Sequence, residues 1–153
     1  MGGARESAFE RGLAALRRKE RTAAELTVWL AEREFPADEI ETALALLTEL
    51  GELGDERFAR RYAEDKRELS GWGAERIRVA LLARGVDHDA IEAALAGDSA
   101  SDQIDRAADL LARRGDQLAD EPARGRALAY LTRRGYDYEI AYEAVRRTER
   151  RAA

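Results

Sequence analysis

Several basic side chains that could bind an anion or an acidic protein surface lie between residues 55 and 70. Arg57, Arg60, Arg61, Lys66 and Arg67 lie in this segment, interspersed with acidic residues and with apolar residues at helical spacing. The spacing predicts an amphipathic helix with a charged outer face. Two interpretations stay open: opposite charges that only stabilise the helix in solvent, or contacts with a partner's carboxylates or phosphates. For the second, Arg57, Arg61 and Arg67 are the first candidates.

Further basic residues lie near predicted helix ends. Arg76 and Arg78 follow a glycine-rich segment, where the free amides of a helix start favour anions. Arg133 and Arg134 end a later helix, where cations favourably oppose the helix dipole without any ligand. Partner binding and ordinary surface charge therefore both remain open for these four residues.

Aromatic residues offer a second kind of binding chemistry. Trp72 lies between two glycines and could stack on an unpaired base, although packing into a helix junction is what we expect. Trp29 lies on an aliphatic helix stripe and is expected in the core. Four tyrosines are expected to pack the last part of the chain: Tyr130, Tyr136, Tyr138 and Tyr142.

Residues suited to catalysis or metal binding are sparse. His88 is the only histidine, and the chain has no cysteine, so a metal site of nitrogen and sulfur ligands is not expected. The many carboxylates fall on polar helix faces, where nothing separates their pKa values into an acid and a base. Phosphate-binding loops, nucleophile elbows and zincin motifs are absent from the sequence. We expect neither an enzyme nor a cofactor.

The composition favours a helical protein that is not a general nucleic-acid binder. Charged residues make up 37% and hydrophobic residues 45% of the 153 residues, with only two prolines. The formal net charge is −5, whereas tight binding to bare nucleic acid usually requires an excess of basic residues. Without cysteines or a long apolar segment, the sequence predicts a cytoplasmic protein.

A repeat of about fifty residues organises the chain. Leu30, Leu81 and Leu131 occupy equivalent places in it, 51 and 50 residues apart. We therefore expect an all-α fold of three tandem three-helix repeats forming an elongated, curved body. The predicted units are 1–50, 51–97 and 98–153, as parts of one continuous body.

Each repeat is expected to hold three helices with recognisable start signals. Thr22 and Glu25 form a capping box, and Asp55 and Asp87 are predicted N-caps. The expected helices are Glu6–Lys19, Thr22–Glu34, Asp38–Leu50, Asp55–Ser70, Gly73–Arg84, His88–Leu95, Ser101–Arg114, Pro122–Arg134 and Asp137–Arg147.

An ordered set of motifs resembles the RecX family. A polar turn precedes Asp55-Glu56-Arg57-Phe58-Ala59, and a Gly-x-Gly helix start leads to Arg76-Ile77 and then to Gly85. The resemblance extends to Arg21–Leu26 and Leu131–Tyr136, and so covers nearly the whole chain. The chain departs from the family pattern at Glu34-Phe35-Pro36 and in its acidic balance.

The resemblance implies a regulator that binds the RecA recombinase inside its nucleoprotein filament. Such a protein lowers strand exchange, ATP hydrolysis and the filament-assisted cleavage that induces the SOS response, and so modulates DNA repair and recombination. We expect a monomer that also makes weak contact with single-stranded DNA. A helical DNA-binding protein that acts without RecA, or a scaffold for an unrelated protein, is the alternative. The residues expected to contact RecA or filament DNA are Arg57, Arg60, Arg61, Lys66, Arg67, Arg76, Arg78, Arg133 and Arg134.

Overall fold

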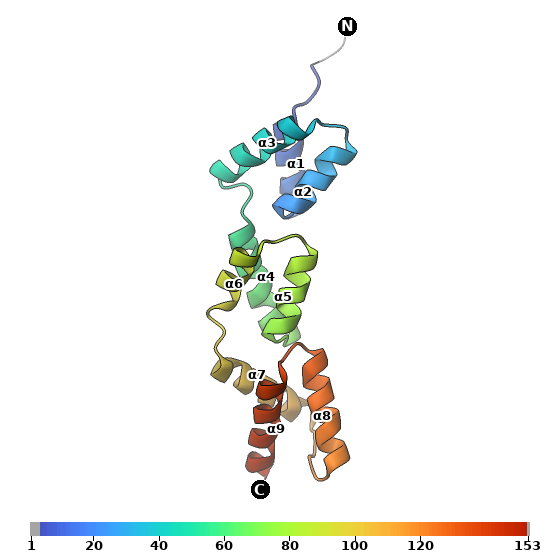
Figure 1. The fold of residues 1–153 in the computed structure, drawn as a ribbon, viewed down its shortest axis with the longest axis vertical. Coiled ribbons are helices and arrows are strands. Elements are labelled where there is room, and N and C mark those ends of the chain that lie inside the picture. Colours follow the sequence, from blue (N-terminus) through green and yellow to red (C-terminus); the bar gives the residue numbers. More distant parts are fainter. Residues whose placement is uncertain (1–3, 153) are drawn as a thin grey trace.

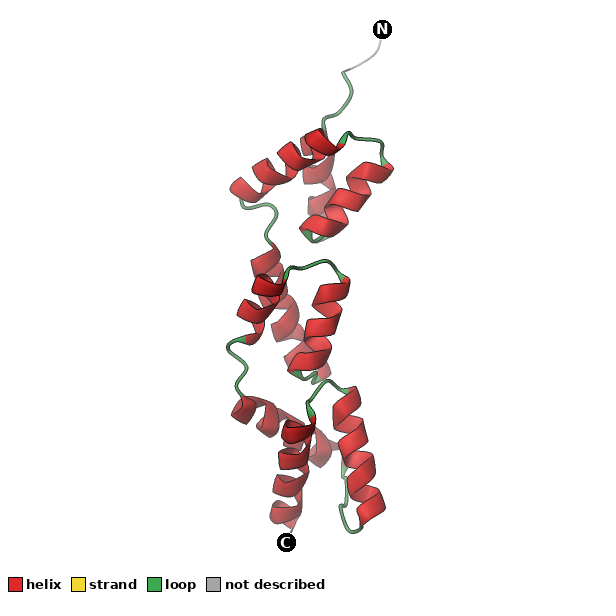
Figure 2. Cartoon of the chain, in the orientation of Figure 1, coloured by secondary structure: helices red, strands yellow, loops and turns green. Residues whose placement is uncertain are grey.

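The described chain is built of helices joined by short loops. The computed structural model describes residues 4–152, and no strand occurs among them (Figure 2). The predicted all-α class is therefore confirmed. The helices are α1 (Ala8–Arg18), α2 (Ala23–Glu32), α3 (Ala37–Glu49), α4 (Asp55–Ser70), α5 (Ala74–Ala83), α6 (His88–Leu95), α7 (Ala100–Arg114), α8 (Glu121–Arg133) and α9 (Tyr138–Ala152).

The helices are grouped in threes along one long axis (Figure 1). In each group the first helix packs against the third, as α1 does on α3, α4 on α6 and α7 on α9. Each group encloses its own apolar core. The structure thus confirms the predicted fold of tandem three-helix repeats in an elongated body. The unit boundaries 1–50, 51–97 and 98–153 stay a prediction, and their outer ends lie beyond the described residues.

Local start signals explain where two of the helices begin. The Thr22 side chain accepts a hydrogen bond from the Glu25 amide while the Glu25 carboxylate accepts one from the Thr22 amide, which confirms the capping box. Asp87 caps α6 by accepting from the Ala90 amide. The prediction for Asp55 is wrong: Gly54 is the N-cap, and Asp55 is the first helical residue of α4. Its carboxylate instead accepts a hydrogen bond from the Ala23 amide of the first repeat.

The observed helix ends agree with those predicted from the sequence, except at the end of the last helix. The α4 and α6 bounds match the predicted ones, and most others differ by one or two residues. The last helix runs to Ala152 rather than to Arg147. After Arg147 the sequence continues mainly with glutamate, arginine and alanine, which favour a helix, and the positive charges of Arg150 and Arg151 interact favourably with the helix dipole at this end.

Two of the four tyrosines expected to pack the last repeat are exposed instead, while Tyr130 and Tyr136 pack against its core. Tyr136 is buried, but Tyr138 and Tyr142 are 65% and 43% exposed, so they do not pack the last repeat as predicted. Trp29 is only partly buried against the first core, and the Arg33 guanidinium lies over its ring at 3.5 Å. Among the described residues, no helix is long and apolar enough to cross a membrane.

Candidate partner-binding surface

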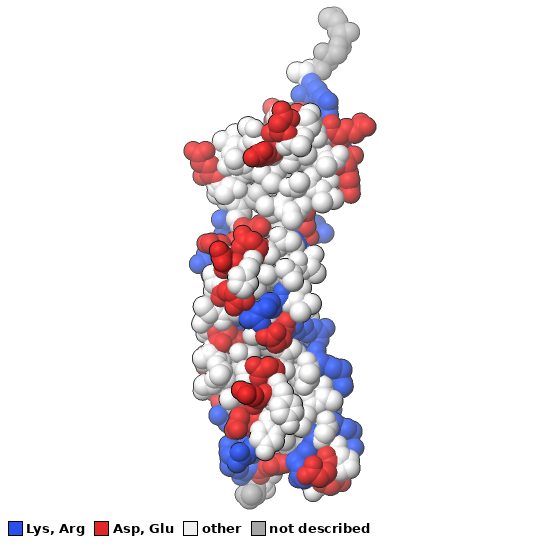
Figure 3. Space-filling view, viewed as in Figure 1, with Lys and Arg blue, Asp and Glu red and all other residues white. Residues whose placement is uncertain are grey.

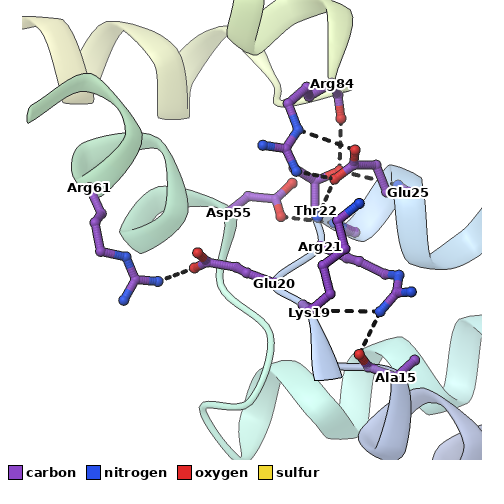
Figure 4. Close-up of polar contacts among 10 residues, drawn as sticks. Ala15, Lys19, Glu20, Arg21, Thr22, Glu25, Asp55, Arg61 and Arg84 are labelled. Atoms are coloured by element: carbon purple, nitrogen blue, oxygen red, sulfur yellow. Dashed lines mark hydrogen bonds and ion pairs between the residues drawn. The ribbon is translucent and has the colours of Figure 1, made fainter. Parts of the chain in front are cut away.

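Polar contacts fix the junction between the first two repeats (Figure 4). The buried Thr22 hydroxyl donates to the Arg84 carbonyl oxygen at 2.7 Å. The Arg84 guanidinium in turn donates to both carboxylate oxygens of Glu25, at 2.9 and 3.2 Å. Arg61 and Glu20 form an ion pair across the same junction. The start of α2 is thereby fastened to the end of α5.

The second junction repeats this arrangement with backbone groups. Gly73 and Thr22 are the N-caps of the middle helices α5 and α2, and the Gly73 amide donates to the Arg134 carbonyl at 2.9 Å. The two backbone segments approach so closely that a Cβ on Gly73 would lie 2.5 Å from the Gly135 carbonyl carbon. Only glycine fits there. Arg84 and Arg134 thus provide equivalent acceptors in successive repeats.

The pKa values of the two carboxyl groups at the first junction are shifted in opposite directions. Partial burial acts to raise the pKa of Glu25, but hydrogen bonds from Arg84 and the Thr22 amide outweigh it, and the pKa is lowered. Burial raises the pKa of Asp55, and the negative charges of Asp87 and Glu25 add to this effect against the Ala23 hydrogen bond. The folded chain therefore favours the ionised form of Glu25, which suits its ion pair with Arg84, and disfavours the ionised form of Asp55.

A buried carboxylate joins the second repeat to the third. The Asp98 side chain is 3% exposed and accepts hydrogen bonds from Arg106 at 2.8 and 3.0 Å. Arg67 Nε lies 3.3 Å from the same carboxylate. Burial acts to lower the pKa of Arg106, but Asp98 and Tyr136 outweigh it and raise the pKa. Asp98 is therefore surrounded by two permanently charged guanidinium groups.

The predicted arginines at the start of α4 are exposed. Arg57, Arg60 and Arg61 lie on its outer surface and line, with Arg67, a hollow of about 450 Å³ against α6. Arg57 donates to the Gly51 carbonyl at 3.0 Å, which still leaves most of its donors exposed. We call Arg57, Arg60 and Arg61 the α4 arginine cluster. Its groups can reach a carboxylate or phosphate on a partner.

A second set of predicted residues meets where α5 approaches α8. Arg76 lies over the Trp72 ring at 4.2 Å, and Lys66 lies over the same ring at 4.7 Å. Arg76 also donates to the Arg133 carbonyl at 3.3 Å, and Arg134 donates to the Ser70 carbonyl at 2.9 Å. Figure 3 shows basic groups gathered at this level of the molecule. Trp72 packs against the second core with cations on its ring, as expected for a junction residue.

Besides Arg61 at Glu20, two more of the predicted residues form ion pairs with carboxylates of the chain. Arg67 is half-buried at Asp98 and donates to the Ala94 carbonyl. Arg78 donates a hydrogen bond to the Glu92 carboxylate at 2.8 Å and also pairs with Glu75, and its hydrogen bond to Glu92 raises the pKa of the guanidinium. The nine predicted residues therefore do not form one patch. They separate into the α4 arginine cluster, the group around Trp72, and these internal ion pairs.

Sequence reasoning missed the residues that join the repeats. Arg84, Asp98 and Arg106 were not singled out, although they form the most extensively bonded contacts between helices. One signal was available for Arg84, because it precedes a glycine at the same place in its repeat as Arg134. Among the described residues, no group of His, Asp or Glu side chains is arranged to hold a metal ion. The arrangement suits recognition through exposed charge on a rigid body.

Comparison with known proteins identifies the group of proteins that share this arrangement. The family model described as the first three-helix domain of RecX matches residues 8–47, and that of the second three-helix domain matches residues 55–95. The regulatory protein RecX of Mycobacterium ulcerans is 37% identical over 131 residues, which cover 83% of this chain and 76% of that protein. The chain belongs to the RecX family. The RecX of Thermobifida fusca is also similar, at 34% identity over 86% of this RecX chain and 72% of its own.

A solved structure shares the fold of this RecX protein. The crystal structure of RecX from Lactobacillus salivarius superimposes with a TM-score of 0.84, covering 93% of this chain and 94% of that one. The two sequences are 21% identical, so the likeness concerns the fold. The sequence relatives and the family models confirm the family that the motifs between Asp55 and Gly85 indicate, and these relatives are described as regulatory proteins.

Proposed function

We propose that this RecX protein binds the RecA recombinase within its nucleoprotein filament and inhibits recombination, ATP hydrolysis and coprotease activity. The observation that carries the proposal is membership of the RecX regulatory family, at 37% identity over most of the chain. In this role the protein acts in the cytoplasm, as a monomer and without catalysis of its own. It modulates DNA repair, recombination and the SOS response.

The architecture supports binding to an extended partner. Three successive cores, with polar contacts at both junctions, give an elongated body whose separate surfaces can contact more than one protomer. Linked contacts raise the overall affinity because the second contact forms at high effective concentration. We take the three repeats to be the units 1–50, 51–97 and 98–153. The second and third units supply the basic residues of the contact surface.

We assign the first contact to the α4 arginine cluster. Arg57, Arg60 and Arg61 are exposed, and guanidinium groups bind carboxylates and phosphates in a fixed, two-pronged geometry. The remaining predicted residues with exposed charge, Arg76 and Arg133, extend the contact toward the third repeat. Arg67 and Arg78 act from within the fold, since their charges already meet Asp98 and Glu92.

The test is DNA-dependent ATP hydrolysis by the cognate RecA on single-stranded DNA. The protein is titrated to well below one copy per RecA protomer, and inhibition or filament loss in that range is expected. An unchanged rate, together with no co-sedimentation on filaments, would refute the proposal.

Charge-reversal variants test the assigned surface. Arg57→Glu with Arg60→Glu should raise the half-inhibiting concentration about tenfold through lost charge complementarity, with helicity retained. The matched control reverses Arg150 and Arg151, two exposed arginines at the end of α9. Full inhibition by the α4 double variant would remove this cluster from the site.

A second function, direct binding of single-stranded DNA, is favoured by the cations around Trp72. Arg76 and Lys66 both contact its ring, and a strand could place phosphates on these cations. Binding to an oligonucleotide without RecA should then weaken with salt, with a log–log slope of about −1.4 for two phosphate contacts. A slope near zero, or no binding at low salt, would exclude this function.

A further inference from the structure

Two hydrogen bonds attach the first repeat to the second at a single point. The Thr22 hydroxyl donates to the Arg84 carbonyl oxygen at 2.7 Å. The next residue, Ala23, donates its backbone amide to the Asp55 carboxylate at 2.9 Å. Both bonds therefore reach the first repeat at the start of α2. Bonds that share one point of attachment hold the distance between two bodies, but they resist rotation about that point only weakly.

Two ion pairs flank this point of attachment. On one side of Thr22, Arg61 of α4 pairs with Glu20 (Figure 4). On the other side, the Arg84 guanidinium pairs with Glu25. The side chains of the first pair are 55% and 46% exposed, and those of the second pair are 29% and 35% exposed. Because dissolved ions screen charges that water reaches, the contacts that oppose rotation of the first repeat weaken as salt is added.

The second junction is attached along a longer stretch of backbone. The turn between α8 and α9 is bonded to residues spread from Ser70 to Glu75: the Arg134 guanidinium donates to the Ser70 carbonyl, and the Glu75 amide donates to a carbonyl of the same turn. Between these two bonds, the buried Tyr136 hydroxyl donates to the Gly71 carbonyl at 2.7 Å. Attachments at several separate residues resist rotation, because turning about one of them breaks the others.

The charged contact at the second junction is also protected from salt. The Asp98 side chain is 3% exposed, and its two arginine partners are largely buried, so dissolved ions screen this contact much less. The first junction has no equivalent of the buried tyrosine bond. Val86 follows the glycine at the end of α5 just as Tyr136 follows the glycine at the end of α8, and a valine side chain cannot donate a hydrogen bond.

We propose that the first junction is a salt-sensitive hinge about which the first repeat turns, while the second and third repeats move as one unit. At low ionic strength the two ion pairs hold the first repeat in the orientation that the structure shows. When salt screens them, the hydrogen bonds of Thr22 and Ala23 remain as the pivot, and the loop between α3 and α4 bends. The rotation redirects the first repeat without disturbing any of the three cores. It is a property of the chain alone and does not depend on RecA.

Spin labels measure the proposed rotation directly. The chain has no cysteine, so labels attach only to introduced ones: Ala45→Cys on α3, Ala93→Cys on α6 and Ala129→Cys on α8, all at exposed positions. Pulsed electron paramagnetic resonance gives the distribution of distances between two labels. Raising the salt from about 0.1 M to about 1 M, which shortens the screening length from about 10 Å to about 3 Å, should about double the width of the distribution for labels at 45 and 93. The distribution for labels at 93 and 129, which reports on the second junction, should keep its width.

Neutral variants separate the two ion pairs from other effects of salt. Glu20→Gln with Glu25→Gln removes both carboxylate charges, and a glutamine at position 25 still completes the capping box. This variant should broaden the distances between labels 45 and 93 at low salt as much as high salt does in the parent chain. The matched control, Glu32→Gln with Glu41→Gln, neutralises two exposed carboxylates of the same repeat and should leave the distances unchanged.

Three results would overturn the proposal. The first is a distribution between labels 45 and 93 that keeps its width at high salt. The second is a Glu20–Glu25 variant that behaves like its control, because the ion pairs would then not restrain the first repeat. The third is equal broadening at both junctions, because the second and third repeats would then not move as one unit. Since these measurements contain no RecA, their outcome is independent of the assay of ATP hydrolysis.

Discussion

Removing the Asp98 carboxylate should destabilise the protein strongly. In Asp98→Asn, two guanidinium groups lose the carboxylate that approaches them at 2.8 and 3.3 Å. Breaking a buried pair by deleting one partner costs roughly 3–5 kcal/mol. The Arg106 and Arg67 side chains keep 19% and 17% of their surface exposed, so water compensates in part and the lower end, about 3 kcal/mol, applies. For a chain of this length that corresponds to a fall in Tm of about 6–12 °C.

Thermal unfolding followed by circular dichroism measures this effect. The matched control is Asp109→Asn, whose carboxylate is 63% exposed and lies 3.9 Å from Arg151, and which should cost less than about 1 kcal/mol. Combining Asp98→Asn with Arg106→Met should recover part of the loss, because one uncompensated charge is removed. If Asp98→Asn lowers the Tm no more than the control does, the carboxylate does not hold the two repeats together.

Three further changes test the core, a junction carboxyl group and a junction backbone. Leu81→Ala, at a fully buried position, should lower the free energy of unfolding in urea by roughly 2–5 kcal/mol. The control Leu82→Ala, at a position that is 64% exposed, should lower it little. Equal losses for the two variants would contradict the core assignment. Because the folded pKa of Asp55 is raised, its ionisation weakens the fold as the pH rises through that pKa. Asp55→Asn should therefore increase the Tm at neutral pH and not below pH 3.8, the ordinary pKa of the group, and a gain that is the same at both pH values would refute this. Gly73→Ala forces its Cβ against backbone and should cost about 1–3 kcal/mol by calorimetry, while Gly97→Ala, with open space around it, should not.

Most of the fold could be predicted because local signals agree with the fifty-residue period. The Thr22 capping box, the Asp87 cap and the repeated leucines each indicate the same helices that the structure has. Asp55 shows where such reasoning fails. The residue type suits an N-cap, but its acceptor is used by the Ala23 amide of another repeat, and no local pattern contains that distant donor.

The candidate site was less predictable, for a related reason. Exposed and structural arginines look the same in a sequence, since both are spaced among acidic residues on helices. Arg60 and Arg67 lie about two turns apart on α4, yet Arg67 contacts buried Asp98 while Arg60 is exposed. Tyr138 and Tyr142 were expected inside because tyrosines often pack cores. Ile140, Val145 and two alanines of α9 fill that role instead.

Equivalent hydrogen bonds at the two junctions give successive repeats of this protein a similar spacing. In both, a carbonyl just before a glycine accepts from the N-cap residue of the preceding middle helix, Thr22 in one and Gly73 in the other. The acceptor at each junction is a main-chain carbonyl, and at the second junction the donor is a main-chain amide as well, so these contacts do not depend on the charged residues displayed on the outer faces. The residues displayed on each repeat can change during evolution while the distance between the displayed surfaces stays the same. A partner built of regularly spaced subunits can then be recognised first by the spacing of the repeats and second by the side chains that each repeat displays.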